Sequence, residues 1–427
     1  MKTSDLHTLF LECNAICTDT RLVKKNDLFF ALTGDNFNGN TFAKTALNNG
    51  AKYAIIDDSE YHIPGQTFLV NDVLEMLQHL ASFHRDYLNI PIIALTGSNG
   101  KTTTKELINV VLSQKYSTTA TIGNLNNHIG VPLTLLSMND KTEIGIVEMG
   151  ANHLKEIETL CAIAKPNFGY ITNFGKAHLE GFGSLEGVIQ GKSELYTFLK
   201  STHGLAFINA KDDKQLEITS DIKTVSFGDH TTQTETIIDL ITADPFVVSR
   251  YQNMQIESQL IGAYNFTNIS AAIAIGSYFE VSHTDIKQAI ESYTPSNNRS
   301  QIITKGKTKI ILDAYNANPT SMKAALESFH LIKDANKIAI IGDMFELGET
   351  AKQEHQNIID LAINLNIDKL IVIGALFNTT TITSNKIQAF NTFEAFKGSL
   401  DPSDLEQSTI LIKASRGMKL ERILDLI

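Results

Sequence analysis

Short apolar runs alternate with longer stretches of helical apolar spacing along most of the chain. In the middle of the chain, the apolar runs at 143–150, 167–175 and 204–210 are typical of buried strands, and amphipathic segments separate them. Strands that alternate with helices predict a parallel sheet with helices on both faces. The segment 222–262 holds shorter and more polar runs, which predict an antiparallel edge.

The same alternation continues toward both ends of the chain. Toward the N-terminus we expect strands at 27–32, 52–58 and 67–72, a helix that ends at Gly50 and a helix over 73–88. Toward the C-terminus we expect helices over 263–279 and 321–332, strands at 309–316, 337–344, 369–376 and 408–415, and a closing helix over 416–427.

A stretch rich in Pro, Ser and Asn at 293–301 has the composition of a linker. The pattern therefore predicts an α/β protein with three domains, at 1–88, 89–296 and 297–427. The chain length of 427 residues is compatible with this division, because a domain usually takes about 100–200 residues.

The composition is that of an ordinary globular protein, with 43% hydrophobic and 19% charged residues. A formal net charge of −11 argues against a nucleic-acid binder or a protein of anionic membrane surfaces, although it allows a local phosphate pocket. The 3 cysteines lack the spacing of a metal site and are typical of reduced thiols. Asp5, His7 and Glu12 stand where a signal peptide would be apolar, and no apolar run approaches the ~18 residues of a membrane span. We expect a soluble, cytoplasmic protein.

The clearest chemical signal is the segment TGSNGKTTT at 96–104, which lies between an apolar strand and a helix. Gly97 and Gly100 let the backbone turn tightly, so that N–H groups and the helix N-terminus can face a polyphosphate. Lys101 would reach the β- and γ-phosphates, and the Thr102 hydroxyl would be placed for Mg²⁺. The alternative is a simple glycine turn with an exposed lysine.

Three further residues are candidates for the site around this loop. Two of them follow strands of the predicted sheet, and the third lies on a predicted helix. Glu148 ends a buried strand, where its carboxylate would be well placed for Mg²⁺. His178 comes after the next strand and could ligate a metal through a neutral imidazole. Lys192 lies on a predicted helix. Taken singly, each also has a structural interpretation, as an exposed strand end, a structural histidine and a surface lysine.

Two polar clusters follow strands in the C-terminal third. They are DAYNANPTSM at 313–322 and GDMFELG at 342–348, and Pro319 suits the first turn of a helix. Polar clusters at the ends of neighbouring parallel strands favour a substrate crevice, although ordinary loop capping is the alternative.

Together these segments resemble the Mur ligase family over nearly the whole chain. The broad family pattern is carried by TGSNGKTTT, the EMG at 148–150, His178, Lys192, Tyr264, Asn265, Asn268 and the closing KASRGMKLE. Four segments resemble the branch that adds D-alanyl-D-alanine to UDP-N-acetylmuramoyl-tripeptide: GNLNNHIGVPLTLL at 123–136, AHLEGFGS at 177–184, DAYNANPTSM and GDMFELG.

The resemblance implies a small N-terminal α/β domain that holds the UDP part of the substrate. It implies a central P-loop parallel-sheet domain that binds ATP, and a C-terminal Rossmann-like domain that closes over the site about a hinge at 295–299. The implied reaction converts the tripeptide carboxylate into an acyl phosphate, which the amine of D-alanyl-D-alanine attacks. The implied enzyme is a cytoplasmic monomer of peptidoglycan precursor synthesis that uses ATP and two Mg²⁺ ions and has small-molecule substrates.

The resemblance also implies roles for individual residues. The implied catalytic residues are Lys101, Glu148, His178 and Lys192. The implied ATP contacts are Gly97, Ser98, Asn99, Gly100, Lys101, Thr102, Thr103, Asn268, Arg299 and Asp313. The implied metal ligands are Thr102, Glu148, His178 and Lys192, the last as a carbamate. The implied substrate contacts are Thr20, Arg21, Asp35, Asn40, Asn126, Asn127, Tyr315, Asn316 and Asn318.

The chain departs from the family pattern at several positions. Leu95 stands where the standard phosphate loop has its first glycine. The other departures are Thr20 in place of Ser, Asn38 and Asn40 in place of Asp and His, Tyr264 in place of His and Lys211 in place of Asp. Most of these lie in loops that resemble UDP-contacting segments.

Several other functions remain open at this point. The nearest are other ligases of the same superfamily, such as the ligase that adds the third stem-peptide residue or a folylpolyglutamate synthetase. A P-loop kinase or ATPase would turn over ATP without an amine, and an inactive nucleotide-binding protein would not turn it over at all.

Overall fold

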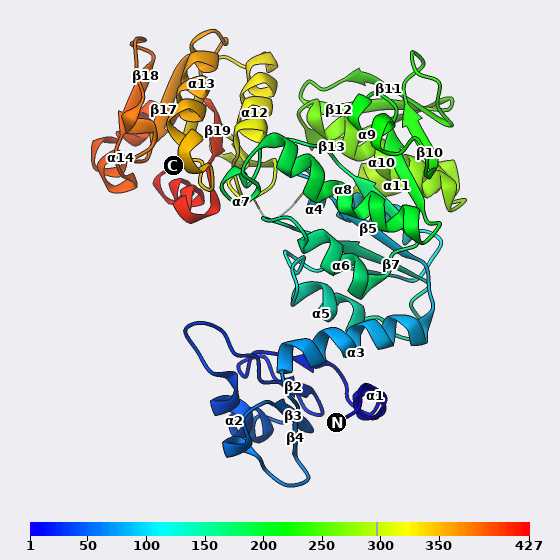
Figure 1. Cartoon of the computed structure of the whole chain (residues 1–427). Coiled ribbons are helices and arrows are strands. Elements are labelled where there is room, and N and C mark those ends of the chain that lie inside the picture. The colour runs from blue at the N-terminus through cyan, green and yellow to red at the C-terminus, as the bar shows by residue number, and fades with distance from the viewer. Residues whose placement is uncertain (296–297) are drawn as a thin grey trace.

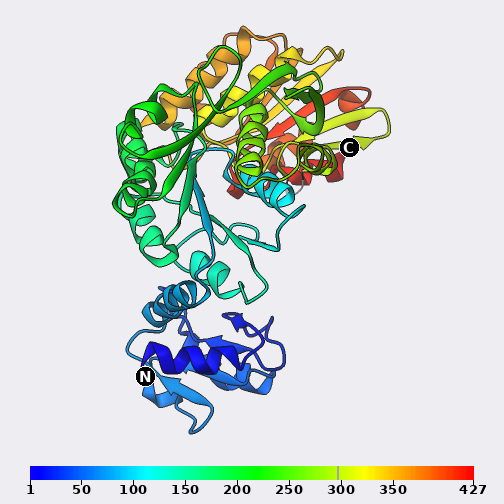
Figure 2. The same cartoon turned by 90° about the vertical axis from the view of Figure 1, so that its right-hand side faces the viewer.

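The computed structural model describes residues 1–295 and 298–427. It contains three separate sheets, each packed against helices (Figure 1). The N-terminal sheet lies at one end of the molecule and the other two lie together at the opposite end, as the view turned by 90° also shows (Figure 2). The predicted α/β architecture of three domains is confirmed. The boundary predicted between residues 296 and 297 lies outside the described residues.

The N-terminal domain has a parallel sheet in the order β1-β2-β3-β4. Its strands are β1 (Ile16–Cys17), β2 (Leu28–Phe30), β3 (Tyr53–Ile56) and β4 (Thr67–Leu69). Its helices are α1 (Thr3–Leu11), α2 (Ala43–Asn48) and α3 (Val73–Leu88), with 3-10 turns η1 (Gly39–Phe42) and η2 (Ser59–Tyr61). The sequence pattern predicted these elements except α1, β1 and the two short turns.

The central domain has a sheet in the order β13-β12-β11-β10-β9-β8-β5-β7-β6. Its strands are β5 (Ile92–Thr96), β6 (Thr118–Ala120), β7 (Ile144–Glu148), β8 (Phe168–Ile171), β9 (Leu205–Asn209), β10 (Lys223–Gly228), β11 (Thr236–Thr242), β12 (Phe246–Tyr251) and β13 (Met254–Ile261). Its helices are α4 (Lys101–Leu112), α5 (Gly130–Leu136), α6 (Glu156–Ala164), α7 (Leu179–Phe182), α8 (Leu185–Ser201), α9 (Asp213–Ile218), α10 (Tyr264–Tyr278) and α11 (His283–Ser292).

The expected antiparallel edge at 222–262 is only partly correct. Strands β11, β12 and β13 pair antiparallel, but β10 pairs parallel with both β9 and β11 and so extends the parallel sheet.

The C-terminal domain has a sheet in the order β14-β15-β19-β16-β17-β18, in which only β14 runs antiparallel to its neighbour. Its strands are β14 (Gln301–Lys305), β15 (Thr308–Leu312), β16 (Lys337–Gly342), β17 (Lys369–Ile373), β18 (Ile387–Phe390) and β19 (Thr409–Lys413). Its helices are α12 (Pro319–Leu331), α13 (Ala351–Ile363) and α14 (Phe393–Ser399), with 3-10 turns η3 (Gly348–Thr350), η4 (Phe377–Thr379), η5 (Pro402–Leu405), η6 (Arg416–Met418) and η7 (Leu420–Leu426).

The closing helix predicted over 416–427 is wrong as a single α-helix. The segment forms the two 3-10 turns η6 and η7, and Lys419 between them has a left-handed backbone with φ of 49°. A non-glycine residue in that conformation interrupts a right-handed helix, so the segment splits there.

Helix α3 joins the N-terminal domain to the central domain. It contacts α1 on the N-terminal side and α5 and α6 on the central side, and Figure 1 shows it between the two bodies. His84 of α3 forms a hydrogen bond of 3.0 Å with the backbone oxygen of Met138 in the central domain. This packing gives the N-terminal domain a broad attachment. Within the described part of the chain, no helix is both long and apolar enough to cross a bilayer.

Candidate active site

A cavity of about 860 Å³ lies where the central and C-terminal domains meet. The central domain lines it with the loop after β5, the end of β7 and the segment after β8, and the C-terminal domain lines it with the segment after β15. Several buried polar atoms on its wall have no hydrogen-bond partner within the described residues, including Asn99 Nδ2, Glu148 Oε2 and Arg299 Nε. Buried polar groups are nearly always paired, so these atoms indicate a cavity built for a polar ligand.

The loop between β5 and α4 has the conformation expected of a phosphate loop. Gly97 has φ of 141°, and a Cβ atom there would lie 2.0 Å from Thr172 Oγ1. Gly100 has φ of 79°, and a Cβ atom there would lie 2.6 Å from Asn268 Oδ1. Both positions therefore require glycine. Leu95 is fully buried inside β5, so the departure at that position lies in the sheet and leaves the turn intact.

Lys101 begins α4 and folds back over this loop. Its Nζ donates to the backbone oxygens of Gly97 at 2.7 Å and Ser98 at 3.3 Å. Burial lowers the pKa of Lys101, while the Glu148 carboxylate opposes that shift. A cation beside a glycine-rich turn at the N-terminus of a helix is suited to a polyphosphate.

Glu148 ends β7 and faces the same cavity. Its Oε1 accepts a hydrogen bond of 2.8 Å from Asn126 Nδ2, and its buried Oε2 has no partner within the described residues. Thr102, on the first turn of α4, also lines the cavity. A buried carboxylate oxygen without a partner beside a threonine hydroxyl fits Mg²⁺, which takes one or two carboxylates and completes its shell with water and phosphate oxygens.

His178 of the central domain lines the cavity and contacts a side chain of the C-terminal domain. Its Nδ1 is in hydrogen-bond contact with Oε2 of Glu346, and this contact lowers the pKa of Glu346. The chain places Glu148 and His178 on one cavity wall, but no group of three or more His, Cys, Asp or Glu side chains suited to a metal occurs in the part of the chain described here. Any metal at this site would therefore need ligands besides these two side chains, such as the Thr102 hydroxyl, water or a substrate oxygen.

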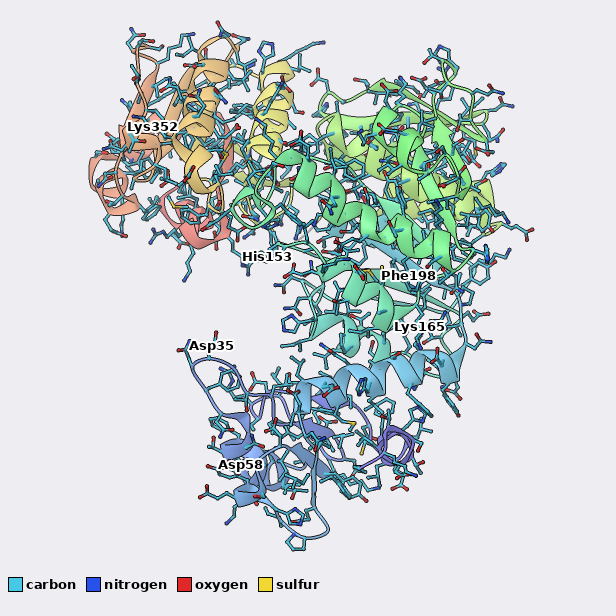
Figure 3. All side chains as sticks on the ribbon, viewed as in Figure 1. Asp35, Asp58, His153, Lys165, Phe198 and Lys352 are labelled. Carbon is cyan, nitrogen blue, oxygen red and sulfur yellow. The ribbon has the colours of Figure 1, made fainter. Side chains whose placement is uncertain are left out.

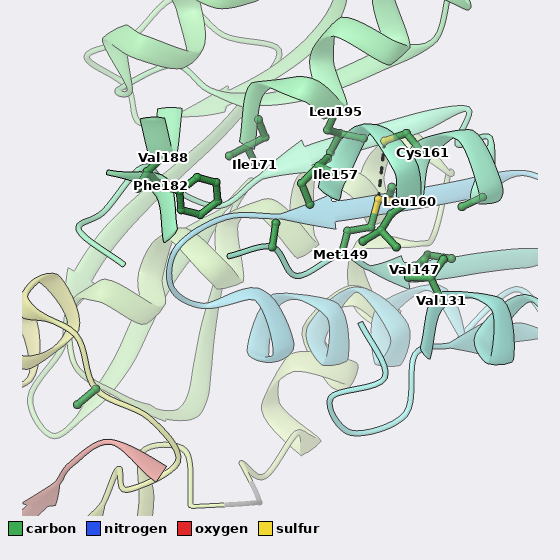
Figure 4. Close-up of a cluster of buried hydrophobic side chains, with 14 of the residues drawn as sticks. Val131, Val147, Met149, Ile157, Leu160, Cys161, Ile171, Phe182, Val188 and Leu195 are labelled. Atoms are coloured by element: carbon green, nitrogen blue, oxygen red, sulfur yellow. Dashed lines mark hydrogen bonds between the residues drawn. The ribbon is translucent and has the colours of Figure 1, made fainter. Parts of the chain in front are cut away.

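Lys192 is fully buried on α8 and does not line the cavity. Its Nζ donates to the backbone oxygen of Ala151 at 3.0 Å and lies 5.2 Å from the centre of the Phe182 ring. Burial, with a smaller contribution from the Lys101 charge, lowers the pKa of Lys192 far below its ordinary value. Figure 4 shows Phe182 and Val188 in the apolar cluster beside it, where Cys161 Sγ contacts Met149 Sδ at 3.8 Å. Such surroundings favour the neutral amine over the ammonium ion.

The C-terminal domain reaches the phosphate loop directly. Asn318 caps α12 through a hydrogen bond from the Ser321 backbone, and its Nδ2 also donates to Asn99 Oδ1 at 2.8 Å. Asp313 follows β15 and accepts hydrogen bonds from Lys413 Nζ at 2.5 Å and from the backbone nitrogen of Ser300 at 3.1 Å. The bond between Asn318 and Asn99 joins the two walls of the cavity, and the Asp313 contacts fix the C-terminal wall.

Tyr315 lies under two arginines. The guanidinium carbons of Arg299 and Arg416 lie 3.5 Å and 4.7 Å from the centre of its ring. Several residues of the central and C-terminal domains that were predicted to contact ATP or the substrate line the cavity. They include Asn126, Asn127, Asn268, Arg299, Asp313, Tyr315, Asn316 and Asn318. Asn268 also accepts a hydrogen bond of 3.1 Å from Thr104 Oγ1, which ties α10 to α4.

Comparison with protein families decides the relationship. The family models that match are "Mur ligase family, catalytic domain" at residues 12–85, "Mur ligase middle domain" at 95–276 and "Mur ligase, glutamate ligase domain" at 298–416.

The chain belongs to the Mur ligase family.

Relatives and solved structures agree with this assignment along the whole length. The chain is 34% identical to the UDP-N-acetylmuramoyl-tripeptide–D-alanyl-D-alanine ligase of Bacillus subtilis, over 97% of this chain and 93% of that one. The crystal structure of MurF from Acinetobacter baumannii is 31% identical and superimposes with a TM-score of 0.86, over 100% of this chain and 98% of that one. MurF of Thermotoga maritima in complex with ADP is 26% identical with a TM-score of 0.83, over 98% and 97% of the two chains.

In this Mur ligase the four residues predicted to contact UDP lie in the N-terminal domain, outside the cavity wall. Asp35 lies at the tip of a loop that projects toward the upper half of the molecule, where His153 lies on the facing edge (Figure 3). Arg21 is exposed and paired with Asp19 at 2.6 Å. The Asn40 side chain is buried and exchanges hydrogen bonds with Asp57, and Thr20 is half-buried with its backbone oxygen bound by Asn49. The UDP contacts stay predictions.

The sequence patterns missed several residues of the cavity wall. They include Asn124, His128, Asn152, Leu154, Lys155, Glu156, Thr159, Asn173, Ser300, Thr320 and Lys413. The pairing of β15 with β19 could have revealed Lys413, because parallel strands end at the same sheet edge and Leu312 stands opposite Ile412. Asn173 follows β8 at the edge that carries the phosphate loop and accepts a hydrogen bond of 3.1 Å from the Asn99 backbone.

Proposed function

We propose that this Mur ligase joins D-alanyl-D-alanine to UDP-N-acetylmuramoyl-tripeptide with ATP as the energy source. The observation that carries the proposal is the similarity to ligases of that name over nearly the full length of both chains. The geometry supports it, because a phosphate loop and a second domain wall enclose one cavity large enough for several substrates.

ATP would lie with its phosphates against Gly97–Thr103 and the N-terminus of α4. Lys101 would exchange its present backbone acceptors for terminal phosphate oxygens. Asn268, Arg299 and Asp313 line the same cavity and would contact the rest of the nucleotide. The ADP complex of the T. maritima relative supports nucleotide binding in this fold.

Two Mg²⁺ ions would be held by Thr102, Glu148 and His178, with Lys192 contributing as a carbamate. Bound there, they would neutralise charge that develops on the transferred phosphoryl group. The unpartnered Oε2 of Glu148 supports this assignment. Asn126 would keep the carboxylate oriented through Oε1.

In the proposed reaction an oxygen of the tripeptide carboxylate attacks the γ-phosphorus of ATP. The bond between that phosphorus and the bridging oxygen of ADP breaks, ADP leaves and an acyl phosphate is formed. The amine of D-alanyl-D-alanine then attacks the acyl carbon, phosphate leaves and an amide forms with loss of one proton from the amine. Both steps gather negative charge, so Lys101 and the loop N–H groups would supply most of the stabilisation. The C-terminal wall with Tyr315, Asn316 and Asn318 would hold the peptide part and exclude water from the acyl phosphate.

A phosphate-release assay tests this function. With ATP, Mg²⁺ and UDP-N-acetylmuramoyl-tripeptide, we expect rapid release only when D-alanyl-D-alanine is added, and little with D-alanine or glutamate. Preference for another amino acid would favour a different ligase of the superfamily. Turnover without any amine would favour an ATPase, and no turnover with all substrates would favour an inactive nucleotide-binding protein.

The carbamate on Lys192 is a separate proposal. The neutral Nζ would attack the carbon of carbon dioxide and lose one proton, which turns an uncharged amine into a carbamate anion suited to a metal. Lys192→Ala should lower activity by about 10- to 100-fold, and a small carboxylate such as formate should restore part of it. Lys200→Ala, on the exposed end of α8, serves as the control. Loss without rescue would contradict the carbamate.

We also propose that the enzyme acts as a cytoplasmic monomer divided near 1–88, 89–296 and 297–427. The cytoplasm is where ATP and nucleotide-linked precursors are available, which supports that location.

A further inference from the structure

Glu346 lies outside the cavity wall but holds a residue on it. It belongs to the loop between β16 and η3 in the C-terminal domain, and its Oε2 is in hydrogen-bond contact with Nδ1 of His178 in the central domain. A carboxylate in such a contact can only accept, so Nδ1 carries the proton. None of the other hydrogen bonds found among the described residues involves Nε2 of His178, which is left as the nitrogen able to donate its lone pair.

The contact is part of a docking of two loops. The backbone nitrogen of Glu180 donates to the backbone oxygen of Glu346 at 3.1 Å, two residues beyond His178. Two residues before it, Lys176 Nζ lies 2.6 Å from Glu354 Oε1, and the Lys176 backbone nitrogen donates to Thr320 Oγ1 at 2.9 Å. His178 is therefore fixed by the C-terminal domain on both sides as well as at its ring.

We propose that Glu346 is a positioning residue that fixes the tautomer and ring orientation of His178 and thereby completes the metal site only when the C-terminal domain is docked. The inference rests on the proposed function, because it assigns His178 a role toward Mg²⁺. Histidines that ligate metals commonly donate their second ring nitrogen to a carboxylate, which orients the ring and raises its basicity. Here that carboxylate comes from a different domain than the histidine, so docking and metal affinity are coupled.

Two variants and a matched control test the proposal. Glu346→Ala removes the acceptor, Glu346→Gln keeps its shape without the charge, and Glu349→Ala removes a carboxylate three residues away that contacts neither His178 nor the cavity. The first readout is the tautomer of His178, from long-range ¹H–¹⁵N correlations of ¹⁵N-histidine-labelled protein at about pH 8, above the ordinary histidine pKa. His178→Gln assigns the signal.

We expect the wild type and Glu349→Ala to hold the proton of His178 on Nδ1, and Glu346→Ala to lose that preference. An unchanged tautomer in Glu346→Ala overturns the proposal.

The second readout is Mn²⁺ binding, followed by electron paramagnetic resonance with a non-hydrolysable ATP analogue and no other substrate. Glu346→Ala should weaken Mn²⁺ binding by about 10- to 100-fold, Glu346→Gln should also weaken it, and Glu349→Ala should leave it unchanged. Binding by Glu346→Ala that equals the wild type overturns the proposal while the proposed function stands. A wild type that binds neither metal nor nucleotide would overturn the proposed function itself.

Discussion

At the scale of single residues, Lys101 and Glu148 carry opposite charges on the cavity wall and interact with each other. Glu148 has one oxygen held by Asn126 and one without a partner, and Lys101 is held by backbone oxygens of its own loop. The Glu148 carboxylate opposes the effect of burial on the pKa of Lys101. Each group is therefore paired only in part, and a phosphate with its cation would satisfy both.

Lys101→Ala should lower phosphate release by a factor of about 10² to 10³ or more, because a buried cation would no longer stabilise the transferred phosphoryl group. Phosphate release with all three substrates measures the effect. Lys115→Ala, on an exposed part of the same domain, should retain activity. Near-normal turnover of Lys101→Ala would contradict the role of the phosphate loop.

At the scale of elements, strand ends determine where the chemistry lies. The carboxyl ends of β5, β7 and β8 meet at one edge, which brings together the phosphate loop, Glu148 and Asn173. The ends of β15 and β19 bring Asp313 to Lys413 in the same way. The cavity therefore follows from parallel pairing in two different sheets.

Helix α12 gives a prediction at this scale, because Asn318 has two tasks. Asn318→Ser should keep the N-terminal cap but lose the bond to Asn99, whereas Asn318→Ala should lose both. Both variants should weaken binding of an ATP analogue, but only Asn318→Ala should lose about 1 kcal/mol of stability. Calorimetric titration and thermal unfolding separate the two effects, and equal stability of both variants would contradict the cap.

Helices α1 and α3 give a prediction of pH dependence. His7 Nε2 and His84 Nδ1 lie 3.0 Å apart, and burial lowers the pKa of both histidines, with the His84 charge adding to the effect on His7. The unfolded chain then binds more protons than the folded one, so the free energy of unfolding falls as the pH drops below about 6.5. His7→Gln should reduce this dependence by up to ~1.4 kcal/mol per pH unit.

Urea unfolding at a series of pH values measures this dependence. His79→Gln, on the exposed face of α3, should retain the wild-type dependence. If His7→Gln kept the wild-type pH dependence of the free energy of unfolding, the His7–His84 pair would not bind fewer protons in the folded chain than in the unfolded chain.

The elements could be predicted from the sequence where the pattern is local. The helix over 73–88 and the strand, loop and helix around Lys101 occur at the expected places because apolar spacing and glycine positions specify them. The turns after Arg416 could not be predicted as such, because nothing in the apolar spacing marks the left-handed conformation of Lys419.

The candidate site could be predicted in part for the same reason. Strand ends placed Glu148 and Asp313 at the cavity, but the position of Lys192 behind the wall depends on how α8 packs. The contacts between Asn99 and Asn318 and between His178 and Glu346 join residues 219 and 168 positions apart, for which no local pattern exists.

At the scale of the whole molecule, the active site depends on how two domains dock. One apolar cluster runs through all three domains and includes Leu6, Val147 and Ile311. The polar contacts of Lys176, His178 and Glu180 lie at the margin of the cavity. The C-terminal domain, docked as it is, therefore completes the wall of the site.

The ion pair between Lys176 and Glu354 tests whether activity depends on docking of the C-terminal domain. Lys176→Met and Glu354→Gln should each lower kcat/KM, and the double variant should lose less than the sum of both, with a coupling of about 0.5 kcal/mol or more. The Glu354 side chain is 11% exposed and the Lys176 side chain 45% exposed, so the pair is shielded from solvent on the glutamate side. The exposed pair of Lys323 and Glu327 on α12 should show no coupling, and strict additivity at Lys176 and Glu354 would contradict docking through this contact.

The sheet order of the central domain has a consequence for biosynthesis. Strand β5 is the first strand of that sheet to leave the ribosome. In the folded sheet it lies between β7 and β8, which are made later. Until Glu148 has emerged, β5 is an apolar strand with two open edges, and the edge that β8 covers stays open until Ile171 has emerged. Open apolar edges invite pairing with other chains, so the nascent chain is exposed to aggregation, and can benefit from a chaperone, in that interval.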